Sequence, residues 1–536
     1  MIAVTFRGYG RYLRSLPGFF ADALTVAQAR AQIQENVATR ADRFLRLLRE
    51  RVYAPGSPYR ILLDASGIGP EAVEQIARTA GLEAALDYLR DSGVYLTFQE
   101  FKEGRGAWRG DRVYRFQPEQ FDNPHPVVGI PTRSGATRSR GTWTSLTLEH
   151  LAAGEVAHLG LVLDAFVGEE APVLTWQLGF PSGAGIASWF ALGRLRRSHA
   201  RWFSLTPIDR RPWQRHMLLF RAARRAARRA GLERPAPEYM PVQHTGRVLD
   251  IILGVRRQVG PLAVMTTPSC AVRLCAAARG RGASLEGVMF LAGAEPLTLG
   301  KVAEITRAGA RVASYYAMAE VEGYVGVPCA NPSRPDEMHF LSDHLAFIRN
   351  PRVHGDVSLD ALMVTTLHAS APKLLLNVEI DDFALIDERR CGCLWDQLGC
   401  QWHLSGVRSF TKLTGEGTTV LGTNCVQIIE EILPQTFGGS SVDYQLLEAE
   451  DEHHLTRLFL LVSPRLGPVD EPRVTTRFLE ALEATRDRPL GGTRSIWSQA
   501  ESIRVLRQDP IPTGSGKLFP FHTLAGPAAQ AGVLPS

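Results

Sequence analysis

The chain has 536 residues, of which 45% are hydrophobic and 21% charged, and its formal net charge is +5. A chain of this length and apolar content can bury a large core, and we expect two or three domains. Its basic runs at 194–201 and 221–229 alternate with alanine at the spacing of solvated helix faces and are not interleaved with aromatic residues, which argues against nucleic-acid binding.

Helical patterns, for example at 37–52, dominate residues 1–125 and predict an N-terminal helical region. Alternating strand and helix patterns occupy residues 126–407 and predict an α/β core of layered sheets and helices. Residues 408–522 combine an apolar helix spacing with strand patterns, which is typical of a small α+β domain. Residues 523–536 are rich in Ala, Gly and Pro and are expected to form a flexible tail.

The cellular setting is indicated by the N-terminus and the cysteines. The first 30 residues contain no apolar core of signal-peptide length, and the sequence has no apolar run of about 20 residues. Seven cysteines, an odd number, favour a reducing compartment over a disulfide framework. We therefore expect a cytoplasmic protein without a membrane span, and the sequence leaves a homodimer open.

One lysine near the C-terminus lies in an unusual context. Residues 513–517 read Thr-Gly-Ser-Gly-Lys, and Lys517 is one of only five lysines among the 60 basic residues of the chain. A lysine between small residues suggests a compact ammonium that enters a tight site, where the planar guanidinium of arginine would not substitute. The alternative is an exposed turn that happens to contain a lysine.

A second segment, residues 132–142, is a run of small and hydroxylated residues with three arginines. Backbone N–H groups in such a loop can form a concavity for an anion, and Ser, Thr and Arg side chains add donors. The segment is therefore a candidate phosphate cradle, and an ordinary solvated loop is the alternative.

In order and spacing, these segments resemble the acyl-adenylating (AMP-forming) superfamily, specifically its phenylacetate:CoA ligase-like branch. Residues 134–137, Ser-Gly-Ala-Thr, are similar to the family's phosphate loop, and residues 511–517 are similar to its segment with the catalytic lysine. The resemblance spans about residues 55–522. It implies an α/β fold with a large N-terminal acyl-adenylating domain, whose ATP- and acyl-binding core is residues 126–407, and a small mobile α+β C-terminal lid at 408–522.

Further motifs extend the resemblance. Residues 293–296, Gly-Ala-Glu-Pro, match the adenine pocket, Tyr316 and Glu320 match an adenine-stacking aromatic and a magnesium carboxylate, Asp382 matches a ribose-binding aspartate, and Arg408 matches the hinge. A carboxylate suits ribose because it can accept hydrogen bonds from both hydroxyls of a diol. The resemblance makes Lys517 and Glu320 catalytic, and its implied cofactor contacts are Ser134, Gly135, Thr137, Gly293, Ala294, Glu295, Pro296, Tyr316, Asp382 and Arg408.

The chain departs from the family pattern at four of these motifs. Arg138 and Ala319 replace a glycine of the phosphate loop and a hydroxyl beside Glu320, Glu379 replaces an arginine of the ribose strand, and Phe410 replaces an acidic residue of the hinge. These departures favour one alternative, a catalytically degenerate member that acts as a binding or scaffold protein.

Cysteines and histidines suggest a metal. Three thiolates and an imidazole form a good tetrahedral zinc set, and a closed set of four ligands makes the metal structural. The proposed ligands, which the branch also implies, are Cys329, His339, Cys391 and Cys393. Cys400 and His403 are alternates, and a group of reduced, buried cysteines without metal is the other interpretation.

The implied activity is ATP-dependent activation of a carboxylic acid as acyl-AMP, with magnesium, followed by transfer to a thiol, most simply that of coenzyme A. Transfer to an amine or to a carrier protein is the alternative within the same chemistry. The motifs leave the acid itself open.

Overall fold

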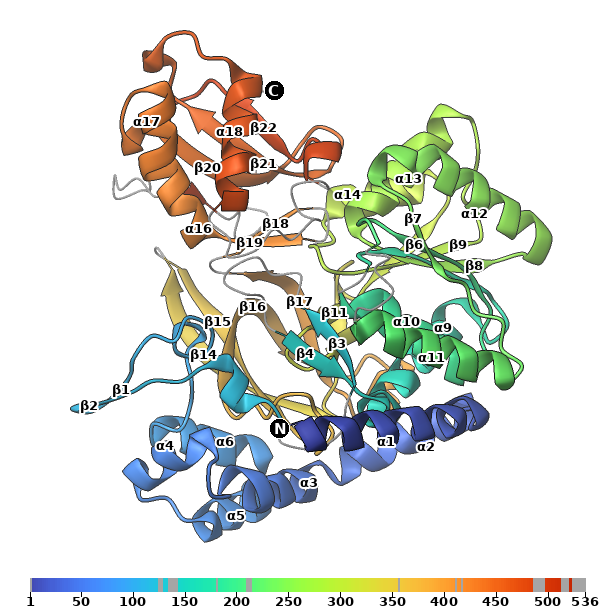
Figure 1. The fold of residues 1–536 in the computed structure, drawn as a ribbon, viewed down its shortest axis with the longest axis vertical. Coiled ribbons are helices and arrows are strands. Elements are labelled where there is room, and N and C mark those ends of the chain that lie inside the picture. Colours follow the sequence, from blue (N-terminus) through green and yellow to red (C-terminus); the bar gives the residue numbers. More distant parts are fainter. Residues whose placement is uncertain are drawn as a thin grey trace.

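The structure is a computed structural model (Figure 1). It describes residues 2–123, 129–133, 143–179, 182–208, 215–354, 357–409, 412–415, 418–484, 497–511 and 520–522. Three larger sheets and their helices form the layered α/β fold that the sequence predicts.

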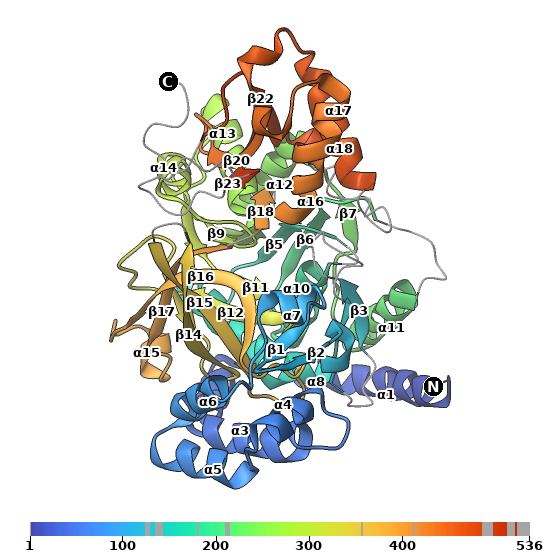
Figure 2. The same cartoon turned by 90° about the vertical axis from the view of Figure 1, so that its left-hand side faces the viewer.

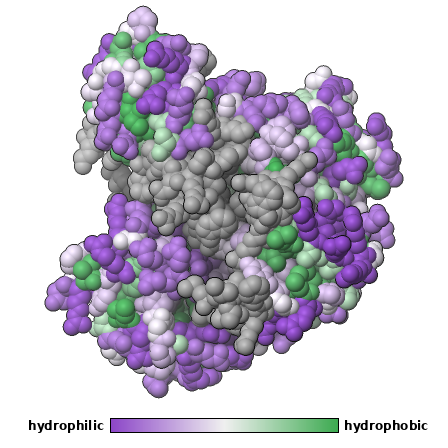
Figure 3. All heavy atoms as spheres, viewed as in Figure 1, coloured by the Kyte–Doolittle hydropathy of each residue, from purple (hydrophilic) through white to green (hydrophobic). Residues whose placement is uncertain are grey.

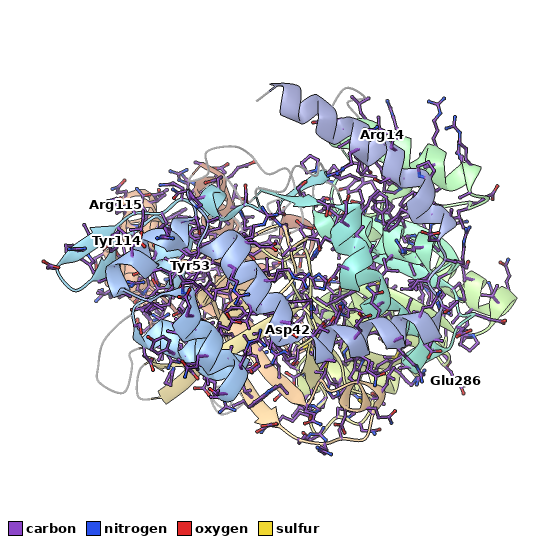
Figure 4. The ribbon with its side chains drawn as sticks, turned by 90° about the horizontal axis from the view of Figure 1, so that it is seen from below. Arg14, Asp42, Tyr53, Tyr114, Arg115 and Glu286 are labelled. Carbon is purple, nitrogen blue, oxygen red and sulfur yellow. The ribbon has the colours of Figure 1, made fainter. Side chains whose placement is uncertain are left out.

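Helices near the N-terminus cover the lower face of the molecule; Figure 4 shows this face, with Arg14 on α1 and Asp42 on α3. Their bounds are α1 Ile2–Ala21, α2 Val26–Ala38, α3 Arg40–Leu47, η1 Leu48–Val52, α4 Pro58–Ser66, α5 Pro70–Thr79, α6 Leu82–Asp91 and α7 Phe98–Lys102. Local sequence explains their starts. Thr25 and Gln28 form a capping box at α2, and Pro58 begins α4, where its missing N–H costs nothing.

A six-stranded sheet, all of whose neighbouring strands pair in parallel, forms one layer. Its order is β10 Arg311–Ser314, β9 Val288–Ala292, β8 Leu262–Thr266, β5 Val173–Gln177, β6 His199–Ser204 and β7 Pro237–Tyr239. The central strands are continuous apolar runs because both faces are covered. One face packs on α12 Thr245–Val259, α13 Pro268–Gly280 and α14 Leu299–Arg307, and the other on α9 Val156–Val167, α10 Gly183–Arg194 and α11 Arg215–Arg229.

A seven-stranded antiparallel sheet lies beside it. Its order is β11 Tyr316–Met318, β12 Gly323–Pro328, β13 Met338–Phe340, β17 Trp402–Ser409, β16 Val378–Glu388, β15 Val357–Thr366 and β14 Leu345–His354. Its core residues pack against helices α3 to α6. The hairpins β1 Ala107–Arg109 with β2 Arg112–Tyr114, and β3 Ile130–Arg133 with β4 Trp143–Leu146, are separate two-stranded sheets.

The C-terminal part forms the top of the molecule, as Figures 1 and 2 show. Its sheet has the order β22 Ile503–Leu506, β21 Thr456–Val462, β20 Tyr444–Glu450 and β23 Phe521–His522, preceded by the hairpin β18 Lys412–Gly415 and β19 Thr418–Leu421. Its helices are α16 Gly422–Gln427, η5 Ile428–Ile432, α17 Leu433–Phe437 and α18 Glu471–Ala484. The helix and strand patterns expected here are confirmed, and residues of this part share a hydrophobic cluster with α12 and α13.

One helical stretch, Leu148–Val167, is long and apolar enough by composition to cross a membrane, which the sequence reading did not anticipate. Within the protein, 67% of its most apolar window is buried, as is typical of the core helix of a globular domain. On the face of the molecule shown in Figure 3, hydrophobic residues form small scattered groups among hydrophilic ones.

Candidate functional site

The segment Gly-Ala-Glu-Pro, residues 293–296, follows β9 at the carboxyl edge of the parallel sheet, where open α/β sheets bind ligands. The N–H of Gly293 donates to the carbonyl of Thr266 at 3.1 Å. A Cβ at Gly293 would lie 2.4 Å from the ring of Tyr315, so only glycine allows this ring to pack there. Tyr315 in turn accepts a hydrogen bond from Gln177 at 2.7 Å.

The side chain of Glu295 anchors this segment to α13. Its Oε2 accepts hydrogen bonds from the N–H and the hydroxyl of Ser269, at 3.2 and 2.6 Å, in the first turn of that helix, where a negative charge is favourable. Lys301, which is fully buried, lies 3.7 Å from the same oxygen and donates to the carbonyl of Pro296 at 3.1 Å. It also donates to Thr456 of β21 at 2.7 Å, so Lys301 joins the segment to the C-terminal sheet.

Tyr316 and Asp382, predicted from different motifs, come into direct contact. The Tyr316 hydroxyl donates to Oδ2 of Asp382 at 2.5 Å, and the Ser409 hydroxyl donates to Oδ1. Burial, and then the Asp382 carboxylate, raise the pKa of Tyr316 well above its ordinary value. The Asp382 carboxyl group is therefore held between two hydroxyls, and a carboxylate can accept more than two hydrogen bonds, as binding of a diol would require.

The Glu320 carboxylate forms an ion pair with Lys102, at the end of α7. Their side chains are only 12% and 18% exposed, so solvent screens the pair weakly. Sequence reasoning missed Lys102, although the scarcity of lysine in this chain was a signal that could have found it. A divalent cation at Glu320 would have to displace this ammonium or bind beside it.

Glu322, two residues further along, is buried and accepts hydrogen bonds from the hydroxyls of Thr132 and Thr144. Burial raises the pKa of Glu322 to about 7. Because these threonines lie on β3 and β4, Glu322 connects the hairpin around the candidate phosphate loop to the loop after β11.

Several predicted residues lie outside the part of the chain that the structure describes. They are Ser134, Gly135, Thr137, Arg138, Phe410 and Lys517. Their roles stay predictions.

One departure from the family pattern, Glu379, and one residue that matches the pattern, Arg408, have structural partners. Glu379 is paired with Arg352 of β14 and accepts a hydrogen bond from Asn350 at 3.2 Å. Arg408 of β17 lies near Glu448 and Asp336, and burial lowers the pKa of its guanidinium while these carboxylates oppose the shift. Since Glu448 belongs to β20, Arg408 stands where the seven-stranded sheet meets the C-terminal part.

The four predicted metal ligands converge. Their ligand atoms all lie within 4.8 Å of one another, with 3.7 Å between the sulfurs of Cys329 and Cys391 and 3.0 and 3.5 Å from His339 Nε2 to the sulfurs of Cys393 and Cys391. Zinc–sulfur bonds of about 2.3 Å at tetrahedral angles place two sulfurs about 3.8 Å apart. The Cys329–Cys391 separation is close to this value, and the His339–Cys393 contact would have to lengthen slightly for the four residues to hold a zinc ion.

The surroundings of these ligands favour the same assignment. Nδ1 of His339 lies 2.7 Å from the carbonyl oxygen of Cys400, a contact that fixes the ring and turns Nε2 toward the sulfurs. A hydrogen bond from the Cys329 thiol lowers the pKa of the Cys393 thiol, so Cys393 loses its proton most readily. Of the alternates, Cys400 contributes its backbone carbonyl, whereas His403 pairs with Glu337 and forms with Glu337 and Cys329 a second group whose ligand atoms lie within 4.8 Å of one another.

No protein-family model and no curated protein sequence matches the chain. Among solved structures, 2-hydroxyisobutyryl-CoA ligase in complex with 2-HIB-AMP and CoA has a TM-score of 0.54 and 12% identity, covering 94% of this chain and 91% of that chain. The amide bond synthetase McbA from Marinactinospora thermotolerans has a TM-score of 0.38 and 12% identity, covering 95% of this chain and 97% of that chain. The first similarity shows that the chain has the fold of the acyl-adenylating, AMP-forming ligases.

Proposed function

We propose that this protein activates a carboxylic acid with ATP as acyl-AMP and transfers the acyl group to the thiol of coenzyme A. The observation that carries the proposal is the contact of Tyr316 with Asp382, since two residues assigned separately to the adenine and the ribose meet in one place. The solved ligase with TM-score 0.54 was crystallised with an acyl-AMP and CoA, which supports the same chemistry. The order of the motifs and the cysteine-histidine set favour the phenylacetate:CoA ligase-like branch.

In this proposal the described residues bind and orient the nucleotide. Asp382 accepts hydrogen bonds from the ribose hydroxyls, and Ser409 and Tyr316 hold its carboxylate in place. The backbone of residues 293–296, anchored through Glu295, lines the adenine side. Positioning of this kind lowers the entropic part of the barrier because the acid and the α-phosphate meet in a fixed geometry.

In the proposed reaction, magnesium and Lys517 stabilise negative charge on the phosphates. Magnesium, when bound, neutralises charge on the phosphoryl oxygens, and Glu320 is the carboxylate that would hold it. Lys102 forms an ion pair with this carboxylate in a partly buried place, and magnesium would have to replace it there. We assign to Lys517 the stabilisation of negative charge that develops on the α-phosphate in the transition state.

We further propose that residues 408–522 form the lid that changes position between adenylation and transfer. Arg408 faces carboxylates of β20, and Lys301 donates to Thr456, so polar contacts join the lid to the large domain. Contacts of this type can be exchanged for others when a hinge moves, because polar groups can rebond in each position. A structural zinc held by Cys329, His339, Cys391 and Cys393 would stabilise the large domain.

A second function, nucleotide binding without catalysis, is favoured by one observation. The ammonium of Lys102 stands at the carboxylate where magnesium is expected. A protein in which this ion pair is permanent would bind ATP and fail to form an adenylate.

Trapping with hydroxylamine separates these functions. The full chain is incubated with ATP, magnesium and hydroxylamine across a panel of aryl, alkyl and amino acids, and hydroxamate is measured. We expect hydroxamate with at least one class of acid, and its absence with all of them, in a protein that binds ATP, would favour the binding function. Replacing hydroxylamine by CoA or by an amine then identifies the acceptor, and an amide product without thioester would contradict transfer to CoA.

A further inference from the structure

A second polar cluster lies in the interior, and none of its members belongs to the nucleotide site or to the cysteine-histidine set. It contains Glu155, the last residue of η3 Leu151–Glu155, His158 of α9, and Asp343 and His344 between β13 and β14. All four side chains are at most 6% exposed. Charged and titratable groups are rarely buried so completely unless they are paired or bind an ion.

The Asp343 carboxylate orients both imidazoles. Nε2 of His158 lies 3.0 and 3.1 Å from its two oxygens, and Nδ1 of His344 lies 3.1 Å from one of them. Each ring therefore turns its other nitrogen away from Asp343. Both of these nitrogens approach the same oxygen, Oε1 of Glu155, at 3.6 Å from His158 Nδ1 and 3.8 Å from His344 Nε2.

The separations between these atoms are too long for direct hydrogen bonds and close to those of two ligands on one ion. N–H···O hydrogen bonds end near 3.2 Å, whereas two ligands at about 2.1 Å from a metal lie roughly 3.4–3.6 Å apart. His158 Nδ1 and Glu155 Oε1 are buried atoms that make no hydrogen bond within the described residues. Leaving two such atoms unsatisfied is unfavourable, and a cation between them would satisfy both.

The two histidines also have a hydrogen-bonding partner of the kind found around metal ligands. Ligating histidines commonly donate their other ring N–H to a carboxylate, which fixes the tautomer and the ring orientation. Asp343 does this for both rings at once. Although burial opposes the shift, the Asp343 and Glu155 carboxylates raise the pKa of His158 to about 10, so binding of a divalent ion at Nδ1 would release the proton of His158.

We propose that Glu155, His158 and His344 are the protein ligands of a second, buried site for a divalent transition-metal ion, with zinc as the ion that suits nitrogen and oxygen donors without a redox role. His344 Nε2 now lies 2.9 Å from the carbonyl of Tyr324, and the ion replaces this hydrogen bond. Because Glu155 also accepts the N–H of Tyr324 at 3.1 Å, the ion fixes β12 directly behind the loop that carries Glu320. A Cβ at Gly323 would lie 2.1 Å from Glu155 Oε1, so glycine is required for this approach.

Metal content per chain tests the site, independently of any adenylating activity. The full chain is reconstituted with Zn²⁺, dialysed and assayed by elemental mass spectrometry, together with His158→Gln, Glu155→Gln, Cys393→Ser and His199→Gln. His199 is a matched control, a buried imidazole that contacts Thr175 outside the cluster. We expect two equivalents in the wild type and the control, and one in each of the other three variants.

Each result is decisive. The second site is overturned if the wild type binds one equivalent that Cys393→Ser loses and that His158→Gln and Glu155→Gln keep. It is also overturned if His158→Gln and Glu155→Gln each still bind two equivalents, or if the wild type binds no metal. One equivalent that is kept in Cys393→Ser and lost in the cluster variants supports it and contradicts the structural zinc instead. If a cluster variant fails to fold, Co²⁺ substitution of Cys393→Ser decides: a bound ion without the thiolate-to-cobalt charge-transfer band supports the site, and no bound ion overturns it.

Discussion

The cysteine-histidine set and the candidate nucleotide site differ in how their predicted side chains are arranged. In the first, four predicted ligands converge with sulfur and nitrogen separations that suit a zinc ion. In the second, Tyr316 and Asp382 meet, but Glu320 is paired with Lys102. A small ion needs only a few side chains on well-packed strands. A nucleotide is larger, and its proposed contacts come from segments that are far apart in the sequence.

The largest expected effect concerns Lys517, on the nucleotide side of this comparison. Lys517→Ala should lower the rate of adenylate formation by about 100-fold or more, because the ammonium acts on charge that develops in the transition state. ATP binding should change little. Lys517→Arg is the matched variant, and we expect it to stay closer to Ala than to wild type since a guanidinium is larger and planar. Adenylate formation by Lys517→Ala within about threefold of wild type would mean that this lysine is misassigned.

Substitutions in the cysteine-histidine set leave the candidate nucleotide-binding residues unchanged. Cys391→Ser and Cys393→Ser should each lose one zinc and lower the Tm by roughly 5–10 °C, because metal binding is coupled to folding. Cys275→Ala, a buried cysteine of α13 outside the set, should keep the metal. Elemental analysis and thermal unfolding measure both effects. Loss of stability without any zinc in the wild type would show that the cysteines only pack.

Lys102 sharpens the comparison, because its ammonium pairs with Glu320, the carboxylate proposed to bind magnesium. Lys102→Met should lower the magnesium concentration for half-maximal adenylation by about tenfold, corresponding to about 1.4 kcal/mol, as the competing cation is removed. Glu320→Gln should raise it. A magnesium titration of initial rates measures both, and an unchanged requirement in Lys102→Met would place the magnesium away from Glu320.

The smallest effects concern the ribose contact. Asp382→Asn should raise the KM for ATP by about 10-fold, because hydrogen bonds to a charged acceptor contribute about 1.5–3 kcal/mol. Tyr316→Phe removes one hydrogen bond to Asp382 and should raise the KM by only about 2–5-fold. The ranking is informative, since a larger effect of Tyr316→Phe would make the tyrosine the direct nucleotide contact and Asp382 its support.

The sequence predicted the layered α/β fold and pointed to the four cysteine and histidine residues that the structure brings together, because these depend on periodicity and on residue types with few alternative uses. It did not predict the partners of Glu320 and Glu295, because Lys102 and Ser269 are distant in sequence and become neighbours only through packing. The rarity of lysine was the usable signal. Lys102, Lys301 and Lys373 all engage in ion pairs with carboxylates and are mostly or fully buried, as a chain that uses arginine elsewhere suggests.

The interior cluster of Glu155, His158, Asp343 and His344 could not be predicted either. Its members come from the helical stretch of η3 and α9 and from a loop almost 200 positions later, and no spacing rule relates them. Glu379 is one of the departures that, in the sequence, favour a catalytically degenerate member, and in the structure it pairs with Arg352 of β14, two strands away in the same sheet. Both cases show that charges placed by long-range packing are visible only in the folded chain.

Acid-dependent exchange of labelled pyrophosphate into ATP tests the central claim most directly, because exchange requires reversible formation of an acyl adenylate. We predict exchange with the wild-type chain in the presence of ATP, magnesium and an accepted acid, none without the acid, and a reduction of about 100-fold or more in Lys517→Ala. A wild-type protein that binds ATP yet exchanges no pyrophosphate with any acid of the panel would contradict the account and leave a nucleotide-binding protein with a ligase fold.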